Sequence, residues 1–474
     1  MNKLKLFIEN FLVYGLGGII GKIIPLIMVP IITRIMPNST YFGISDLSNT
    51  VVSFASALAI MGMYDAMYRM FFEKDDEEHK KMVCSTALIF TLVTSLLVFI
   101  IMLLGRNFIA HYFLGDSQYT YLVYITAIAT LVGATNSIIA APTRMQNKRK
   151  VFVVTSAVSP ILSYSISIPL LLKGYYTIAL PLAAVISGLT IEMSFWFMNR
   201  KWFNLKRFDT KLLKQMLVIA IPLFPNFLIY WVFNSCDKVM IANMLNVGEA
   251  GIYSVGSKLG HASHLIYSAF AGGWQYFAFA TMKEENQVKS NSLIFEYLGI
   301  ISFVVTTFMC ALSFWIFKIL FPTEYLSGYI VAPYLFFAPL LQMLFQVACN
   351  QFIIIKKTWP NMLILSGGAI LNIIINFSLI PILGIEGAAI ATLIGYIVSD
   401  IVCVIVLCRM KLMEISNRFI IAVVIMVIYM AIWRLFFNNI TIMGIIMAII
   451  TSILFVLLYR KDLNKLFKMI NKRK

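Results

Sequence analysis

The chain has 474 residues, of which 60% are hydrophobic and 12% are charged, and its formal net charge is +17. Soluble domains carry roughly 25% charged residues, so this composition excludes a soluble globular protein and indicates an all-α polytopic membrane protein. The basic residues are scattered over short loops instead of forming one face, which argues against a nucleic-acid-binding protein.

Apolar stretches long enough for a helix to cross the membrane recur along the whole chain. A helix needs about 20 apolar residues to cross a hydrocarbon core of about 30 Å, whereas a barrel strand needs about half that length. We therefore predict about 14 transmembrane helices, in chain order 10–34, 43–64, 83–104, 119–141, 151–172, 175–198, 213–235, 250–275, 292–317, 329–354, 361–381, 386–408, 419–437 and 441–459.

The distribution of Lys and Arg over the loops predicts the orientation. With the N terminus in the cytosol, the inner segments hold 30 basic residues and the outer loops hold 6. The positive-inside rule then predicts that both termini are cytosolic. The C-terminal tail is basic and amphipathic, which is typical of a helix lying on an anionic membrane surface.

A shift of 208 residues partly superimposes the sequence on itself, with identities at Met36/Met244, Asn38/Asn246, Gly43/Gly251 and Ile44/Ile252. Duplicated halves of membrane helices are typical of transporters. We predict two parallel-repeat six-helix lobes: an N-lobe over 1–208 with helices 1 to 6, and a C-lobe over 209–412 with helices 7 to 12. Residues 413–474 then hold helices 13 and 14 and the basic tail.

Basic residues within or beside the first helices of each lobe are the main candidates for substrate binding. Lys22 lies near the middle of the first span, where a cation costs about 2.5–3.5 kcal/mol, and Lys258 lies within the eighth. Either could snorkel to an interface, more easily Lys258. Together with Arg34 and Lys238 they predict a cationic cleft that attracts phosphate or carboxylate groups.

Three acids are candidates for charge partners or for binding a coupling ion, H⁺ or Na⁺: Asp46, Asp237 and Asp400. We expect no other cofactor. His261 and His264 lack the accompanying carboxylate or cysteine cluster of a metal site. Because no phosphate-binding glycine loop, HExxH or GxSxG motif occurs, the sequence does not indicate an ATPase or a hydrolase.

Several segments resemble the polysaccharide transporter family, which flips lipid-linked oligosaccharide repeat units for O-antigen, capsule and related polymers. This family belongs to the multidrug/oligosaccharidyl-lipid/polysaccharide (MOP) exporter superfamily. The segments that resemble it are MPNSTYFGISDL, YDAMYRMFFEKDDEEHKK, TRMQNKRK and IPLFPNFLIYWVFNSCDKVMIANMLNVGEAGIYSVGSKL. The resemblance implies a MATE-like fold whose two lobes open alternately to either side. It also implies that Lys22, Lys258 and, more loosely, Arg69 receive the diphosphate of an undecaprenyl carrier.

The sequence therefore predicts a flippase for undecaprenyl-diphosphate-linked oligosaccharides in a bacterial inner membrane, with the polysaccharide polymerase machinery as a partner. A multidrug or cation antiporter of the same superfamily is an alternative, against which Lys22 argues. A second alternative is a membrane-embedded glycan polymerase or acyltransferase, but the outer loops are too short to supply a catalytic cluster.

Overall fold

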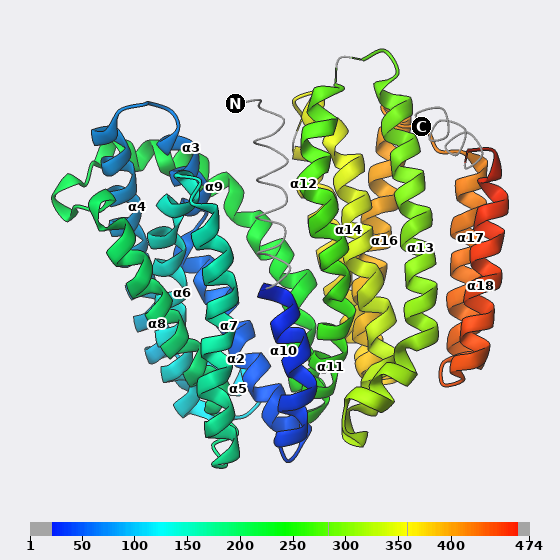
Figure 1. Ribbon diagram of the computed structural model, residues 1–474, viewed down its shortest axis with the longest axis horizontal. Coiled ribbons are helices and arrows are strands. Elements are labelled where there is room, and N and C mark those ends of the chain that lie inside the picture. The colour runs from blue at the N-terminus through cyan, green and yellow to red at the C-terminus, as the bar shows by residue number, and fades with distance from the viewer. Residues whose placement is uncertain (1–20, 283, 358, 463–474) are drawn as a thin grey trace. The chain divides into compact units, whose positions relative to one another are not determined.

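A computed structural model describes residues 21–282, 284–357 and 359–462 (Figure 1). These residues contain helices and connecting turns and no strand, which confirms the all-α prediction. The chain forms two compact units, Met1–Ser254 with Ile375–Ala388, and Val255–Ile374 with Ala389–Lys474. The lobe boundaries at 208/209 and 412/413 concern the sequence repeat and stay predictions.

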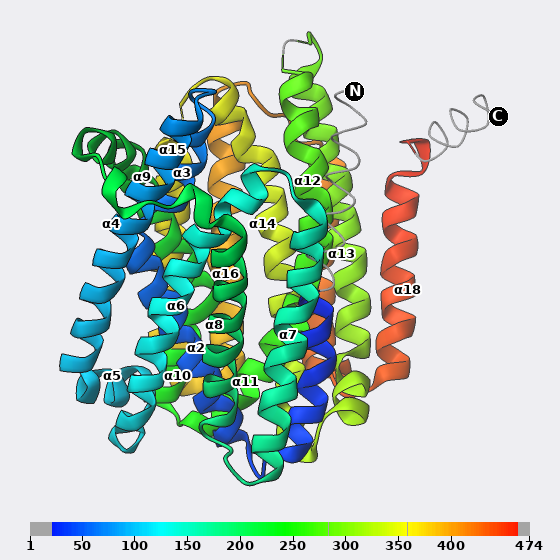
Figure 2. The same ribbon diagram turned by 60° about the vertical axis from the view of Figure 1, so that its left-hand side comes forward.

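The first unit is a bundle in which α6 packs against α2, α4 and α8 (Figure 2). After a helix over 21–35, its helices are α2 (Ser39–Ile60), α3 (Met63–Phe71), α4 (Glu77–Leu104), α5 (Arg106–Phe113), α6 (Thr120–Met145), α7 (Arg149–Leu172), α8 (Ala179–Asn199), α9 (Thr210–Trp231), α10 (Asp237–Met244) and the first half of α11 (Val247–Gly260). A π-helical turn, Val232–Cys236, joins α9 to α10.

Polar caps and one special glycine determine where the helices of the first unit begin and end. The side chains of Asp76 and Asp209 accept hydrogen bonds from backbone N–H groups at the starts of α4 and α9, which satisfies donors that have no partner within the helix. Gly62, with φ of +76°, separates α2 from α3 and lies against the backbone of Ala220 in α9. A side chain at this position would be strained and would clash with α9.

The start of α2 crosses the start of α11 through two glycines that the 208-residue shift made equivalent. A Cβ atom added to Gly43 would lie 2.9 Å from the Gly251 nitrogen, and one added to Gly251 would lie 2.9 Å from the Gly43 nitrogen. Asn38 and Asn246, also equivalent, accept backbone N–H bonds at the two helix starts, at 3.2 Å and 2.9 Å. This contact is therefore locally two-fold symmetric, as expected where duplicated segments meet.

The second unit is built around α13. Its helices are the end of α11, α12 (His264–Ala280), α13 (Gln287–Leu320), α14 (Val331–Ile354), most of α15 (Trp359–Leu383) and of α16 (Ile385–Arg409), α17 (Asn417–Ile432) and α18 (Thr441–Leu458). Figure 1 shows α14 beside α13, and α17 and α18 on its other side.

The last two helices of the second unit are attached to α13 along its length. At one end, the buried Glu296 accepts hydrogen bonds from the Tyr459 hydroxyl at 3.0 Å and from the Ser416 backbone at 2.8 Å. Arg418 bonds Asp462 at 2.5 Å with its guanidinium over the Tyr459 ring. Because this network is largely buried, it holds the α17–α18 pair as part of the α13 bundle.

Twelve helices of the described residues are long and apolar enough to cross a membrane, and each coincides with one of the 14 predicted spans. The first span falls partly outside the described residues, which begin at residue 21 within it; the tail from 463 also lies outside them. The predicted span 250–275 contains a 3₁₀ turn at His261–Ser263, which divides its helix into α11 and α12. Gly260 packs there against the backbone of Ala332 and Leu335, and the chain changes helix type after this contact.

Candidate functional site

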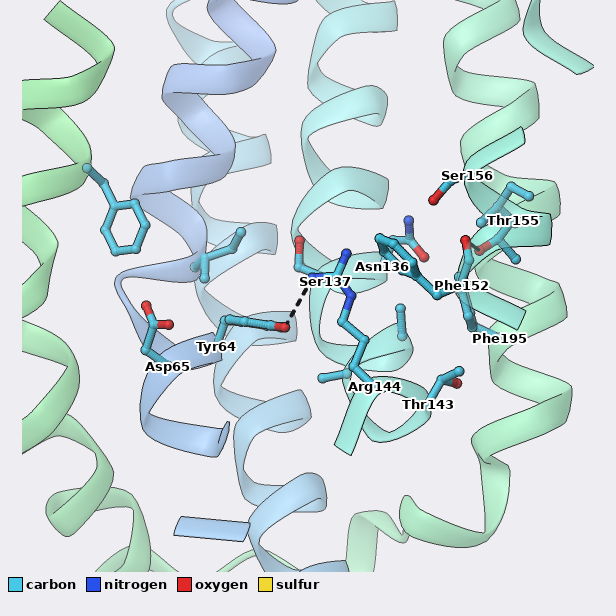
Figure 3. A pocket seen from close by; sticks show the side chains of 15 residues that line it. Tyr64, Asp65, Asn136, Ser137, Thr143, Arg144, Phe152, Thr155, Ser156 and Phe195 are labelled. Carbon is cyan, nitrogen blue, oxygen red and sulfur yellow. Dashed lines mark hydrogen bonds between the residues drawn. The ribbon is translucent and has the colours of Figure 1, made fainter. Parts of the chain in front are cut away.

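A cavity of about 590 Å³ lies within the first unit, where α3, α6, α7, α8 and α9 approach one another (Figure 3). This volume falls in the usual range for small-ligand sites, about 300–1,000 Å³. Its lining combines hydroxyl, amide, charged and aromatic side chains. They are Ile60, Tyr64, Asp65, Asn136, Ser137, Ala140, Ala141, Thr143, Arg144, Phe152, Thr155, Ser156, Ile191, Phe195 and Phe227.

Arg144 is the cation of this cavity and lies in the last turn of α6. Figure 3 shows its side chain between those of Tyr64 and Phe152. The guanidinium carbon lies 4.5 Å from the centre of the Phe152 ring, and Nη1 donates a long hydrogen bond of 3.5 Å to the Tyr64 hydroxyl. A guanidinium stacked on an aromatic ring keeps several N–H donors for a ligand, and its fork geometry matches phosphate oxygens.

Apart from Asp65, the remaining polar side chains of the cavity are uncharged and offer hydrogen bonds. Ser137 and Thr155 donate their hydroxyl protons to carbonyls one turn back in their own helices, both at 2.9 Å, so their oxygens remain acceptors. Asn136 Oδ1 is buried and has no hydrogen-bond partner among the described residues. Burial raises the pKa of the Asp65 carboxyl, which lies just beyond the end of α2.

A second cavity of about 140 Å³ also has Asn136 in its lining. It lies between α2, α6 and α8, and its polar residues are uncharged: Ser48, Asn49, Thr126 and Asn136. The small residues Gly133 and Gly188 border it. The larger cavity therefore has the charged groups and the smaller one has a neutral polar wall.

Lys22, predicted from the sequence as the main substrate-binding residue, is not among the cavity-lining residues but lies on a helix beside the cavity. It follows Gly21, whose added Cβ would lie 3.4 Å from the Ser156 carbonyl of the cavity wall. Lys22 is exposed, and so are Arg34 near the other end of the same helix and Arg69 on α3. Neither arginine is among the cavity-lining residues. Lys258, in the second unit, is half-buried in the last turn of α11.

Asp46 and Lys238 form a buried ion pair in the first unit. The Lys238 Nζ lies 2.6 Å from Asp46 Oδ2, with side-chain exposures of 13% and 5%. These residues are far apart in the sequence, on α2 and α10. The pair supplies each charge with the partner that burial requires.

The other two acidic candidates differ sharply in their surroundings. Asp237 accepts a 2.7 Å hydrogen bond from the Tyr253 hydroxyl at Oδ2 and a 2.7 Å bond from the Asn376 amide at Oδ1. Asp400, on α16 in the second unit, is 8% exposed, and neither of its oxygens has a hydrogen-bond partner in the described structure. The rings of His261 and His264 are 5.3 Å apart, and the described residues contain no cluster of three metal-ligating side chains.

Sequence reasoning missed Arg144 and Phe152 as site residues. Arg144 lies in a basic loop, where the positive-inside rule already accounts for a cation. The signal that could have singled it out is the aromatic Phe152 soon after it, combined with Tyr64 at the end of an earlier span, but their contact depends on the packing of three helices.

The fold is that of a polytopic helical membrane protein with a polar cavity among the helices of its first unit. A family model described as polysaccharide biosynthesis protein matches residues 7–274, more than half of the chain. The chain belongs to this family. A search of curated proteins found no match.

Solved structures with the same fold include a flippase and a multidrug transporter. The lipid II flippase MurJ in an inward closed conformation has a TM-score of 0.67 at 16% identity, over 95% of this chain and 100% of that chain. An inward-facing multidrug resistance MATE family transporter of the MOP superfamily has a TM-score of 0.63 at 14% identity, over 84% of this chain and 94% of that chain. Its outward-facing counterpart has a TM-score of 0.55 at 14% identity, over 86% and 95%.

Proposed function

We propose that the protein flips undecaprenyl-diphosphate-linked oligosaccharide units from the cytosolic to the outer leaflet of a bacterial inner membrane, for cell-surface polysaccharide biosynthesis. The observation that carries this proposal is the cavity of the first unit, in which a guanidinium, neutral hydrogen-bonding groups and aromatic rings lie together. Phosphate oxygens fit the guanidinium, whereas sugar rings offer hydroxyl groups to the polar wall and C–H faces to the aromatic rings.

Transport by this route requires that the polar head group leave water while the lipid tail stays in the bilayer. Desolvating a phosphate in an apolar interior is strongly unfavourable unless a cation and hydrogen-bond donors replace the water. Arg144 provides such a cation, and the exposed Lys22 provides a second near the same wall. In this proposal the lobes open alternately to either side, both termini are cytosolic, and a polymerase uses the flipped product.

Replacing Arg144 tests the proposal most directly. We expect Arg144→Gln to lower the affinity for a lipid diphosphate-linked sugar about tenfold, or about 1.4 kcal/mol, and Arg144→Lys to lower it less. Arg106→Gln serves as the matched control, because Arg106 is an exposed arginine that is not among the cavity-lining residues. Equal binding and flipping by the Gln variant and the wild type in proteoliposomes would contradict a role for this cavity.

Lys22 gives a second test. We expect Lys22→Ala to abolish surface appearance of the glycan in cells while the protein still inserts, and Lys22→Arg to retain part of the activity. Membrane abundance is measured in parallel, so that loss of protein is distinguished from loss of transport. Unimpaired export by the alanine variant would remove Lys22 from the proposed substrate path.

The second candidate function is a multidrug or cation antiporter, which the Asp65 carboxyl in the cavity wall favours. A cavity for organic cations needs an anionic partner, and Asp65 supplies one. If the protein is an antiporter, Asp65→Asn should abolish export of a cationic dye, and Arg144→Gln should leave that export intact or raise it. This effect of Arg144→Gln is the opposite of the loss expected for a flippase.

A further inference from the structure

Asp400 is a carboxyl group enclosed in the second unit without the partners that an ionised carboxylate needs. Its exposure is 8%, and both side-chain oxygens lack hydrogen-bond partners among the described residues. An ionised carboxylate in an apolar interior is so unfavourable that such a group takes up a proton unless a cation or several donors stabilise it. The protonated, neutral form is the one that these surroundings accommodate.

The other two intramembrane acids singled out by the sequence lack this property. Asp46 has the Lys238 ammonium at 2.6 Å, and Asp237 receives hydrogen bonds from Tyr253 and Asn376. Both sets of partners favour the ionised form. Asp400 therefore differs from them in the charge state that its environment selects.

Among the described residues, the titratable groups within electrostatic reach of Asp400 include two cysteines, Cys349 on α14 and Cys403 one turn further along α16. Thiols are weak hydrogen-bond donors, and they are soft ligands, whereas a hard cation such as Na⁺ takes several oxygen ligands. These two thiols are poor ligands for a sodium ion and are compatible with a protonated carboxyl group.

Further polar atoms on α14 lack partners close to Cys349 in the sequence. The Gln346 Oε1 and Asn350 Nδ2 atoms are buried and unsatisfied among the described residues. Gln346 lies about one helical turn before Cys349, whose thiol bonds the Gln346 carbonyl, and Asn350 follows Cys349 directly. Buried polar groups without protein partners are normally satisfied by internal water, so these two atoms are candidate water contacts on α14.

We propose that Asp400 is a proton-binding site of the second unit, separate from the substrate cavity of the first unit, and that its proton couples transport to a pH gradient. The coupling rests on the proposed flippase function, whereas the binding site itself does not. A proton reaches the carboxylate from the outer solution, converts it to the neutral acid that is stable when enclosed, and leaves to the cytosol when the unit rehydrates. Each cycle carries one proton across, and the carboxyl group returns to its starting state.

Infrared spectroscopy of the purified full-length protein tests the site without any transport assay. A protonated carboxyl group gives a C=O stretching band that shifts in D₂O and that an ionised carboxylate lacks. We expect such a band at neutral pH, its loss in Asp400→Asn and its displacement in Asp400→Glu. Asp75→Asn is the matched control, because Asp75 is fully exposed and paired with Lys80, so the band should remain. A spectrum of the wild type without this band, or with a band that Asp400→Asn leaves unchanged, overturns the proposal.

Proteoliposomes with a lipid diphosphate-linked disaccharide as the probe test the coupling. We expect an imposed pH gradient to accelerate flipping severalfold in the wild type, and Asp400→Asn to flip at one rate with or without the gradient. A sodium gradient should have no effect. Acceleration by sodium alone, or a pH-gradient response that survives in Asp400→Asn, overturns the coupling. If the wild type flips no probe while the Asp400 band is present, the proposed function fails and the proton site stands.

Discussion

The contact between Gly43 and Gly251 allows a sharp prediction about stability. Each glycine faces the backbone of the other helix, and an added Cβ would lie 2.9 Å from the opposite backbone nitrogen and closer still to a carbonyl oxygen of that helix. Replacing Gly43 by alanine adds one methyl group where the crossing of α2 and α11 has no room. The methyl group meets backbone atoms, which cannot move aside as a flexible side chain can.

The size of the effect follows from these distances. Ordinary contacts of Cβ atoms fall at 3.4–4 Å, so the two helix starts must separate by at least about 0.5 Å, and more to clear the carbonyl oxygen. Overpacking of this kind costs about 1–3 kcal/mol. Alanine is otherwise the better helix former by up to about 1 kcal/mol, so a measured loss of stability would understate the steric term.

Thermal unfolding of the purified protein in detergent measures this effect. We expect Gly43→Ala and Gly251→Ala to lower the unfolding midpoint by similar amounts, because the contact is symmetric. Gly367→Ala is the matched control: Gly367 lies within α15, and nothing lies within 4 Å of its added Cβ, so its midpoint should stay the same or rise. Equal midpoints for Gly43→Ala and Gly367→Ala would refute the reasoning.

Three further substitutions test other contacts. Lys238→Met removes the ammonium partner of the buried Asp46 and should lower stability by about 3–5 kcal/mol, and adding Asp46→Asn should restore most of this loss in the same unfolding assay. Glu296→Gln removes the charge beside Arg418 and should speed proteolysis of the α17–α18 pair; an unchanged cleavage rate would contradict the proposed attachment. Phe152→Leu removes the ring under the cavity guanidinium and should weaken binding of a lipid diphosphate-linked sugar by about 0.5–2 kcal/mol, with membrane insertion unchanged, and equal binding would show that the stacking is dispensable.

The sequence predicts the membrane helices well because a single property, the length of an apolar run, decides them. The length of an apolar run does not reveal the break at His261–Ser263, since the residues on both sides of it are apolar enough to extend one span. At this break Gly260 lies close to the backbone of Ala332 and Leu335, a contact between segments that hydropathy cannot detect.

Pairings between distant residues are the part of the site that the sequence leaves open. The repeat correctly singled out Gly43 and Gly251, because small residues and caps recur at equivalent turns. It could not indicate that Lys238 reaches Asp46 on another helix instead of the adjacent Asp237. Each partner is ordinary in its own segment, and only the packing of α2 against α10 turns two interfacial charges into a buried pair.

The distribution of charge between the two units supports a division of labour in the proposed transport cycle. In the first unit the candidate acids Asp46 and Asp237, neither of which lines the cavity, have cationic or hydrogen-bonding partners that favour one charge state. In the second unit the described structure leaves Asp400 without hydrogen-bond partners, so its charge state depends on hydration. Energy coupling requires a group whose charge changes during the cycle, and a substrate site works best when its charge does not. Separate units can satisfy both requirements, because a conformational change that hydrates Asp400 need not alter the groups that hold the ligand.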